Sequence, residues 1–290
     1  MIFRTLRIVR DYFHNLILFV EFGISGVMAR TASPALRVGP GHPSSTALRA
    51  LRVLEEVGAN AAPLSVTDVA QRVDIDRAVA YRMLVTLFNA GYLLRDGSGR
   101  RYRLSHKLLS LSRHLLIESR RTELVRECLD DLAAHMLESV HYSLLEGMET
   151  VLVQRAKGRQ FVSVNFEIGE RSRLHCTAIG KAVLAFQDSA FIERVIAAGL
   201  PRLAAKTITG PDALRAECAR IRAQGYAYDD IEFAEDMRCV AVPVFEPGGK
   251  VESGISISGP IPRFDHAKLD ALRDRMLVAA RKLSERLSGR

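Results

Sequence analysis

Tryptophan is missing from this 290-residue sequence and cysteine occurs only four times, which limits the kinds of site that the chain can build. The four cysteines are Cys128, Cys176, Cys218 and Cys239. They form no CxxC pair and have no histidine at zinc-ligand spacing, which argues against a structural metal and a disulfide framework. We therefore expect no metal, no cofactor and a reducing, cytoplasmic setting.

The N-terminal segment lacks an apolar run long enough to span a bilayer. Its runs over 16–20 and 22–28 are short and are separated by Glu21. Arginines precede them, as in a secretory signal, but no clean cleavage site follows. Two interpretations of residues 1–43 stay open: the start is assigned too early and Met28 initiates the chain, or the segment is a real amphipathic arm or a membrane-surface helix. For the whole protein we expect no membrane partner.

The net positive charge lies entirely in the first 120 residues. They hold 17 Lys and Arg against 9 Asp and Glu, whereas residues 121–290 hold 24 of each. The chain is long enough for two domains, and its 48% apolar content is enough for two buried cores. Charge concentrated in one half indicates a dedicated module that binds an acidic partner, either nucleic acid or an anionic membrane surface.

Residues 44–105 carry the pattern of a helix-turn-helix followed by a hairpin. Apolar residues recur at helical spacing over 44–57. Ser65 and Asp68 form a capping box that starts a short second helix, and Asp76 can cap a third helix that ends before Gly91. The core side of this third helix is expected to hold Val79, Met83, Leu84, Leu87 and Phe88.

The outer face of the third helix is the strongest candidate for reading DNA. Arg77 and Tyr81, like Ala78 and Arg82, are separated by four residues and so lie on one face. Arginine suits bidentate contacts with guanine, and alanine can touch a thymine methyl group. The alternative is an ordinary amphipathic helix with solvated arginines.

A hairpin with a basic tip follows, with strands expected near 92–95 and 100–104. A third helix followed by such a hairpin predicts a winged helix-turn-helix, in which the wing contacts phosphates. The remaining DNA-binding candidates are Arg100, Arg101 and Arg103 of the wing and Ser65 of the second helix. A leucine-rich linker helix within 106–120 can then join the domains and pair with a second subunit, or pack on its own chain.

Residues 121–290 alternate helices with strands and predict an α+β domain. Helices are expected near 122–138, 178–187, 188–198, 211–224 and 265–287, and strands near 141–146, 150–156, 161–166, 239–245 and 250–258. No glycine-rich phosphate loop follows a strand, which argues against a doubly wound nucleotide-binding fold.

Three stretches of this domain have the composition of a ligand site: 175–182, 225–243 and 255–260. The first enters a helix through small residues, and in the last the alternation places Ser256 and Ser258 on one face. Asp229 and Asp230 can be acid/base carboxylates, a pocket hydrogen bond or a loop cap. Cys239 can be a nucleophile, a core residue or a pocket-lining thiol. Lys181 can attract an acidic ligand or lie on the surface of its helix.

Taken together, these motifs resemble the IclR family of bacterial transcriptional regulators over about residues 44–288. The winged helix, the string at 175–185, the Gly-Tyr-Ala-x-Asp-Asp-x-Glu string at 225–232 and the Ser-x-Ser-Gly-Pro ending at 256–260 match in order and spacing. The resemblance implies a GAF-like effector domain, dimers often assembled into tetramers, and control of catabolic genes by a small organic acid.

The resemblance also implies which residues line the effector pocket. By position these are Ala178, Ile179, Asp229, Cys239, Ser256 and Ser258, with Phe161 and Val164 as candidates for its apolar wall. Two departures stand out in the helix-turn-helix. Ala78-Val79 replaces a common Ser-Thr at the start of the recognition helix, and Asp74 replaces a common glycine in the turn, where aspartate is tolerated.

We therefore expect a ligand-responsive transcriptional regulator, a repressor or an activator. It has an N-terminal extension (1–43), a winged helix-turn-helix (44–105), a linker helix (106–120) and an effector-binding and oligomerisation domain (121–290). Its partners are double-stranded operator DNA, a small organic acid, further copies of the chain as a homodimer or tetramer and, in addition, RNA polymerase. The main alternative is a small-molecule enzyme with a basic appendage, and another is a membrane-associated sensor.

Overall fold

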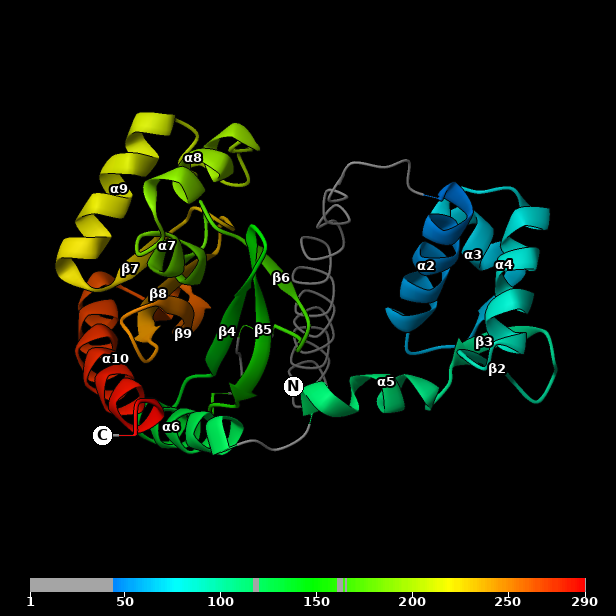
Figure 1. Cartoon of the computed structure of the whole chain (residues 1–290), viewed down its shortest axis with the longest axis horizontal. Coiled ribbons are helices and arrows are strands. Elements are labelled where there is room, and N and C mark those ends of the chain that lie inside the picture. Colours follow the sequence, from blue (N-terminus) through cyan, green and yellow to red (C-terminus); the bar gives the residue numbers. More distant parts are fainter. Residues whose placement is uncertain (1–43, 117–119, 161–163, 165, 290) are drawn as a thin grey trace, which may run out of the picture. The chain divides into compact units, whose positions relative to one another are not determined.

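The computed structural model describes residues 44–116, 120–160, 164 and 166–289 (Figure 1). The chain divides into two compact units, Met1–Leu116 and Ile117–Arg290. The N-terminal extension and Phe161 lie outside the described residues, so the interpretations given for them are not addressed by the structure. Within the described part, none of the helices has the length and apolarity that a membrane crossing requires.

The first unit is a three-helix bundle with a small sheet. Its elements, labelled as in Figure 1, are α2 (Ser45–Gly58), β1 (Leu64–Ser65), α3 (Val66–Val73), α4 (Arg77–Asn89), β2 (Leu93–Arg95), β3 (Arg101–Leu104) and α5 (Lys107–Leu116). The sheet has the order β1-β3-β2 and is antiparallel. The expected hairpin is therefore extended by a third strand, because Leu64 and Ser65 pair with Tyr102 and Arg101.

The caps expected in this unit are confirmed. The Ser65 hydroxyl accepts a hydrogen bond from the Asp68 amide at 3.2 Å, and the Asp68 carboxylate accepts one from the Ser65 amide at 2.8 Å. Asp76 Oδ1 accepts from the Ala78 amide at 2.8 Å and starts α4. Asp74 occupies the left-handed region with φ 54°, a conformation that aspartate adopts more readily than most residues. These contacts fix the turn between α3 and α4.

The second unit is built on one six-stranded antiparallel sheet of order β6-β5-β4-β9-β8-β7. Its strands are β4 (Val140–Glu146), β5 (Glu149–Ala156), β6 (Arg171–Arg173), β7 (Ala227–Asp230), β8 (Met237–Phe245) and β9 (Val251–Pro260). Its helices are α6 (Arg120–Met136), α7 (Ala178–Leu184), α8 (Ser189–Ala197), α9 (Pro211–Gln224), the short η1 (Ile261–Arg263) and α10 (His266–Leu287).

Most of the expected elements occur within a few residues of the expected bounds, but the sequence interpretation missed β6, β7 and η1. It also placed a strand near 161–166. Residues 161–163 and 165 are not described, and Val164 and Phe166 have no regular secondary structure. Helix α6 begins at 120 and ends at 136, two residues before each expected bound.

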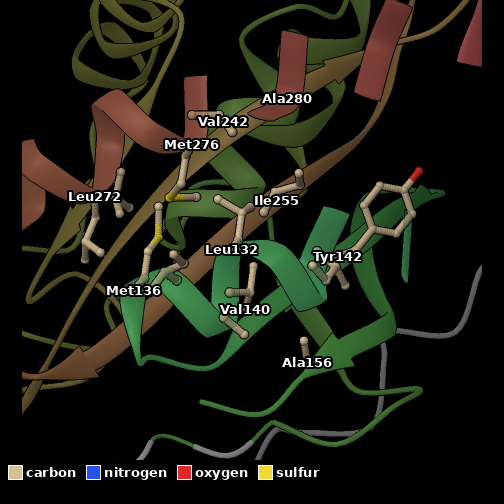
Figure 2. Packing of buried hydrophobic residues seen from close by; sticks show 14 of the residues in the cluster. Leu132, Met136, Val140, Tyr142, Ala156, Val242, Ile255, Leu272, Met276 and Ala280 are labelled. Atoms are coloured by element: carbon tan, nitrogen blue, oxygen red, sulfur yellow. The ribbon is translucent and has the colours of Figure 1, made fainter. Parts of the chain in front are cut away.

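Strand alternation divides the side chains of the sheet between two faces. Val242 of β8 and Ile255 of β9 belong to the core that packs against α6 and α10, as Figure 2 shows with Leu132 and Met276. The opposite face packs against α7 and carries polar as well as apolar side chains. The first face therefore supplies a continuous hydrophobic core, and the second supplies the site described below.

The close approach of Gly259, at the end of β9, to Phe264 allows the packing of this core to be tested. A Cβ added to Gly259 would lie 1.9 Å from Cε2 of Phe264, a fully buried ring. Overpacking of this kind typically costs about 1–3 kcal/mol, so Gly259→Ala is expected to lower the urea midpoint of the full chain, followed by circular dichroism. Gly97→Ala is the control, because Gly97 has no atom within 4 Å of the added carbon. Equal midpoints for the two variants would contradict the packing.

Candidate functional site

The first unit has an open surface depression between α3, α4 and the wing. It is lined by Ser65, Val66, Thr67, Asp76, Arg77, Ala78, Tyr81, Arg95, Gly99, Arg100 and Tyr102. Five of the eight DNA-binding candidates thus lie around one depression. The other three, Arg82, Arg101 and Arg103, are exposed residues outside its lining. The surface is basic and concave, as a surface that receives a polyanion is expected to be.

The outer face of α4 is free to contact a partner. Arg77, Ala78 and Arg82 are exposed, and the Tyr81 side chain is 52% exposed. The buried side of the helix is centred on Ala80, Leu84 and Leu87. Of the five residues expected on the core side, Leu84 and Leu87 are buried, whereas Val79, Met83 and Phe88 are only partly buried. Ala80, which was not expected there, is buried as well.

The arginines of the wing differ in their surroundings. Arg101 donates to the Pro63 carbonyl at 3.1 Å and lies 3.6 Å from the Asp68 carboxylate, so its guanidinium is turned toward its own module. Arg95 lies over the rings of Phe88 and Tyr102. Arg100 and Arg103 remain exposed. The wing therefore presents these two arginines most directly to solvent.

The second unit holds a cavity on the polar face of the sheet, with about 450 Å³ of space between atoms, part of it open to solvent. Its lining consists of His141, Ser143, Leu152, Phe166, Glu170, Ser172, Thr177, Ala178, Ile179, Asp229, Phe233, Met237, Cys239, Ser256 and Ser258. Strand pairing sets much of this arrangement. Asp229 pairs with Cys239, which pairs with Ser258, while His141 pairs with Ser256 one row along. The start of α7 covers the opposite side, where the Ile179 side chain closely approaches Gly254.

Six of the effector-binding candidates meet in this cavity: Ala178, Ile179, Asp229, Cys239, Ser256 and Ser258. Val164 does not line it. Instead, it is half-buried and packs against the apolar cluster around α7. The lining combines apolar side chains with a few polar groups, as in a small-molecule site.

Asp229 is fully buried and only partly satisfied by hydrogen bonds. Its Oδ1 accepts from the amides of Glu232 at 2.8 Å and Phe233 at 3.3 Å. Its Oδ2 has no hydrogen-bond partner among the described residues. Burial raises the pKa of Asp229 to about 7, although the two amides and the charge of Lys181 oppose the shift. With this pKa, the carboxyl group can accept a hydrogen bond from a ligand when ionised and donate one when protonated.

Asp230 has a different role from that of its neighbour. Its carboxylate pairs with Lys206 at 2.6 Å and with Arg238 at 2.5 Å, and it does not line the cavity. The two cations help to keep its pKa below the ordinary value. Of the two adjacent aspartates, only Asp229 is therefore available to a molecule in the cavity.

His141 is a cavity residue that the sequence interpretation missed. It is buried, and neither of its ring nitrogens has a hydrogen-bond partner within the described part of the chain. Burial, together with the charge of Arg155, lowers its pKa to about 4, which keeps the imidazole neutral at pH 7. Its ring meets Phe166 edge to face at 5.4 Å. Glu170 and Phe166 were missed as well, and no local pattern in the sequence marks any of the three.

The structure contradicts both interpretations of Lys181 made from the sequence, attraction of an acidic ligand and a position on the helix surface. This residue is 1% exposed, does not line the cavity, and donates to Glu217 at 3.1 Å and to Glu232. Its pairing with Glu232 anchors the turn after Asp229. In that turn Ile231 adopts φ 65°, a strained conformation for a β-branched residue. Lys181 is therefore a buried structural lysine that holds the turn beside the cavity.

The nucleophile interpretation of Cys239 is also wrong. The side chain is almost fully buried, and burial beside Asp229 holds the pKa of the thiol well above its ordinary value. A reactive cysteine needs a lowered pKa and access to solvent. Cys239 is instead a neutral thiol in the cavity wall. No group of three His, Cys, Asp or Glu side chains suitable for a metal ion occurs in the part of the chain that the structure describes.

Comparison with known families adds an independent finding to this geometry. The family model "Bacterial transcriptional regulator IclR C-terminal" matches residues 117–285, and the model "IclR helix-turn-helix domain" matches residues 46–97. The first model covers the cavity, and the second covers the part of the surface depression that precedes Gly99.

Individual relatives and a solved structure agree with these matches. The chain is 32% identical to the HTH-type transcriptional regulator BhcR of Paracoccus denitrificans, over 81% of this chain and 85% of that protein. It is 30% identical to the HTH-type transcriptional regulator KdgR of Escherichia coli, over 84% and 92%. The crystal structure of the Thermotoga maritima IclR superposes with a TM-score of 0.69 at 29% identity, over 84% of this chain and 98% of that one. The expected fold class is confirmed.

Burial shifts the pKa values of Asp229 and His141 in opposite directions, so their removal is expected to have opposite pH dependences. The folded pKa of Asp229, about 7, exceeds the ordinary 3.8, so its contribution to stability is present below pH 3.8 and lost as the pH rises toward 7. The folded pKa of His141, about 4, is below the ordinary 6.5, so its contribution is present above pH 6.5 and lost as the pH falls toward 4.

Relative to the unmodified chain, Asp229→Asn should therefore gain stability as the pH rises from 4 to 7. His141→Gln should gain stability as the pH falls from 6.5 to 4. Urea unfolding at a series of pH values measures both differences. Two variants whose stability runs parallel to that of the parent across this range would show that neither side chain is buried as described.

Proposed function

Because the chain belongs to the IclR family of bacterial transcriptional regulators, we propose that α4 and the wing bind operator DNA and that the cavity receives the effector that controls this binding. The protein is a ligand-responsive, DNA-binding transcriptional regulator. The families and relatives that it matches are regulators and not enzymes, so the alternative of an enzyme with a basic appendage is wrong.

The observation that carries the DNA-binding proposal is the exposed face of α4. Arg77, Tyr81 and Arg82 extend from the second helix of a helix-turn-helix, the element that enters a major groove. Arg100 and Arg103 of the wing, and Arg101 once released from Asp68, would contact phosphates. Ser65 at the start of α3 and Ala78 of α4 complete the surface.

The cavity supports an effector of small size. Its buried polar groups suit an organic acid that carries further polar substituents, and Ala178, Ile179, Cys239, Ser256 and Ser258 would contact it alongside Asp229. The ligand must bind the DNA-competent and DNA-incompetent arrangements with different affinities, because a ligand without this difference shifts no equilibrium. Control of catabolic genes, action in the cytoplasm and contact with RNA polymerase follow as further parts of the proposal.

A homo-oligomer is proposed from apolar side chains exposed in the first unit. Leu109 and Leu111 of α5 are 59% and 58% exposed, and Leu51 of α2 is 53% exposed. Large exposed leucines on a linker helix are suited to pairing with a second copy. A dimer would place two α4 helices one helical turn of DNA apart, which a two-fold symmetric operator requires.

Removal of two arginines from α4 tests the DNA-binding surface. On the intergenic DNA upstream of its own gene, Arg77→Ala/Arg82→Ala is expected to bind at least tenfold more weakly than the unmodified chain, because base and phosphate contacts are both lost. Mobility shifts across a salt series measure this change. The control is Arg49→Ala/Arg52→Ala, which removes the same charge from exposed positions of α2. Equal loss in both variants would mean that only net charge matters.

Charge placed on α5 tests the oligomer. Leu109→Glu/Leu111→Glu is expected to shift the full chain from dimer to monomer in analytical ultracentrifugation, because buried carboxylates oppose an apolar interface. Leu203→Glu is the control, since Leu203 is also exposed, at 44%, but lies in the second unit. A sedimentation coefficient unchanged by the α5 substitutions would remove this helix from the proposed interface.

A further inference from the structure

The end of α4 and the segment that leads into α5 are joined through the backbone of Tyr92. Its amide donates to the Leu87 carbonyl in the last turn of α4 at 2.9 Å, and its carbonyl accepts from the Ser105 amide at 2.9 Å. Gly91, with φ 81°, makes the left-handed turn that ends a helix in this way. A single residue is therefore hydrogen-bonded both to α4 and to the start of the linker helix.

Lys107, the first residue of α5, adds a side-chain contact across the same junction. Its Nζ donates to the Ala90 carbonyl at 2.7 Å and lies 4.6 Å from the centre of the Tyr92 ring. Ala90 is the C-cap of α4, where unpaired carbonyls and the negative end of the helix dipole favour a cation. The Lys107 amide in turn donates to the Ser105 hydroxyl at 3.2 Å. The first residue of α5 is thus bound to the last carbonyl of α4.

The connection that precedes α5 is too short to act as a flexible hinge. Only residues 105 and 106 separate β3 from α5 (Figure 1). Leu104, the last residue of β3, packs against the core of the first unit. Both ends of this short connection are therefore held, and the direction of α5 relative to α4 is set by the junction.

We propose that this junction, the Lys107 joint, consisting of Ala90, Tyr92, Ser105 and Lys107, determines which spacing of DNA half-sites the protein accepts. The inference rests on the proposed function, in which α4 contacts DNA and α5 pairs two copies of the chain. A bend between these helices moves one α4 relative to the α4 of the second copy, whereas a fixed joint holds the two at one distance and angle. Lys107 is a positioning residue and does not belong to the residues proposed to contact DNA.

Hydrogen exchange on the full chain tests the joint without DNA. Lys107→Met removes the ammonium group and keeps an unbranched side chain, whereas Lys107→Arg keeps a cation that can donate to Ala90. The amides of Leu108 and Leu109, which bond to carbonyls of the preceding turn, are expected to exchange at least threefold faster in Lys107→Met than in the unmodified chain or Lys107→Arg. Equal exchange in all three proteins would overturn the joint.

A change in half-site spacing tests the consequence for DNA binding. The probes are the site that footprinting locates upstream of the gene, and the same site with two base pairs inserted at its centre. The insertion rotates the half-sites by about 70° and separates them by about 7 Å. The unmodified chain and Lys107→Arg are expected to bind the lengthened site at least tenfold more weakly in fluorescence anisotropy. In Lys107→Met this penalty should fall at least threefold.

Arg49→Met is the matched control, because it removes one positive charge from an exposed position of α2. It is expected to keep the full penalty for the lengthened site. An unchanged penalty in Lys107→Met would overturn the proposal, as would an equal fall in Arg49→Met, which would assign the effect to net charge. Circular dichroism and sedimentation of each variant verify its fold and its oligomeric state.

Failure of this inference is distinguishable from failure of the proposed function. DNA binding that depends on Arg77 and Arg82 but is indifferent to spacing disproves the joint and leaves the DNA-binding surface intact. Faster exchange in Lys107→Met, in a chain whose DNA binding ignores Arg77 and Arg82, supports the contacts of the joint and disproves the DNA-binding surface.

Discussion

The alternation of side chains along three central strands is the constraint on which the second unit depends. On β4, β8 and β9, one set of residues, including Tyr142, Val242 and Ile255, faces α6 and α10 and forms an apolar core. The residues between them face α7 and include buried polar groups. Because the period of a strand is two, a slip of one residue would place the histidine, the cysteine and the serines in the core. Core and cavity are therefore fixed by the same register.

Side chains beside the polar face of the sheet are held in place by contacts between residues that are far apart in the sequence. Lys181 of α7 pairs with Glu217 of α9 and Glu232 after β7, and Glu232 donates its amide to Asp229. Removal of one partner from a buried ion pair of this kind strongly destabilises the folded protein, because the other charge is left buried and unpaired. The same network lies beside the strained turn at Ile231 and beside Asp229, whose Oδ2 has no hydrogen-bond partner among the described residues.

The features predicted correctly from the sequence are those that local sequence patterns determine. Helix caps at Ser65 and Asp76 depend on neighbours within three residues, and the shared face of Ser256 and Ser258 follows from strand period alone. The sequence interpretation did not predict β7, whose two aspartates are poor strand formers and which forms by pairing with β8. It also missed the burial of Lys181, whose partners lie 36 and 51 residues away. His141 was missed because its burial depends on long-range pairing that brings β4 and β9 together.

A ligand-responsive regulator requires energetic coupling between the cavity and the DNA-binding surface. Thermodynamic linkage makes this coupling measurable, because a ligand that changes DNA affinity by some factor must have its own affinity changed by DNA by the same factor. The measurement is fluorescence anisotropy of operator DNA with and without a saturating cavity ligand, matched by titration of that ligand with and without DNA. We expect equal factors of at least fivefold, abolished by Asp229→Asn. Factors of one in both directions would contradict it.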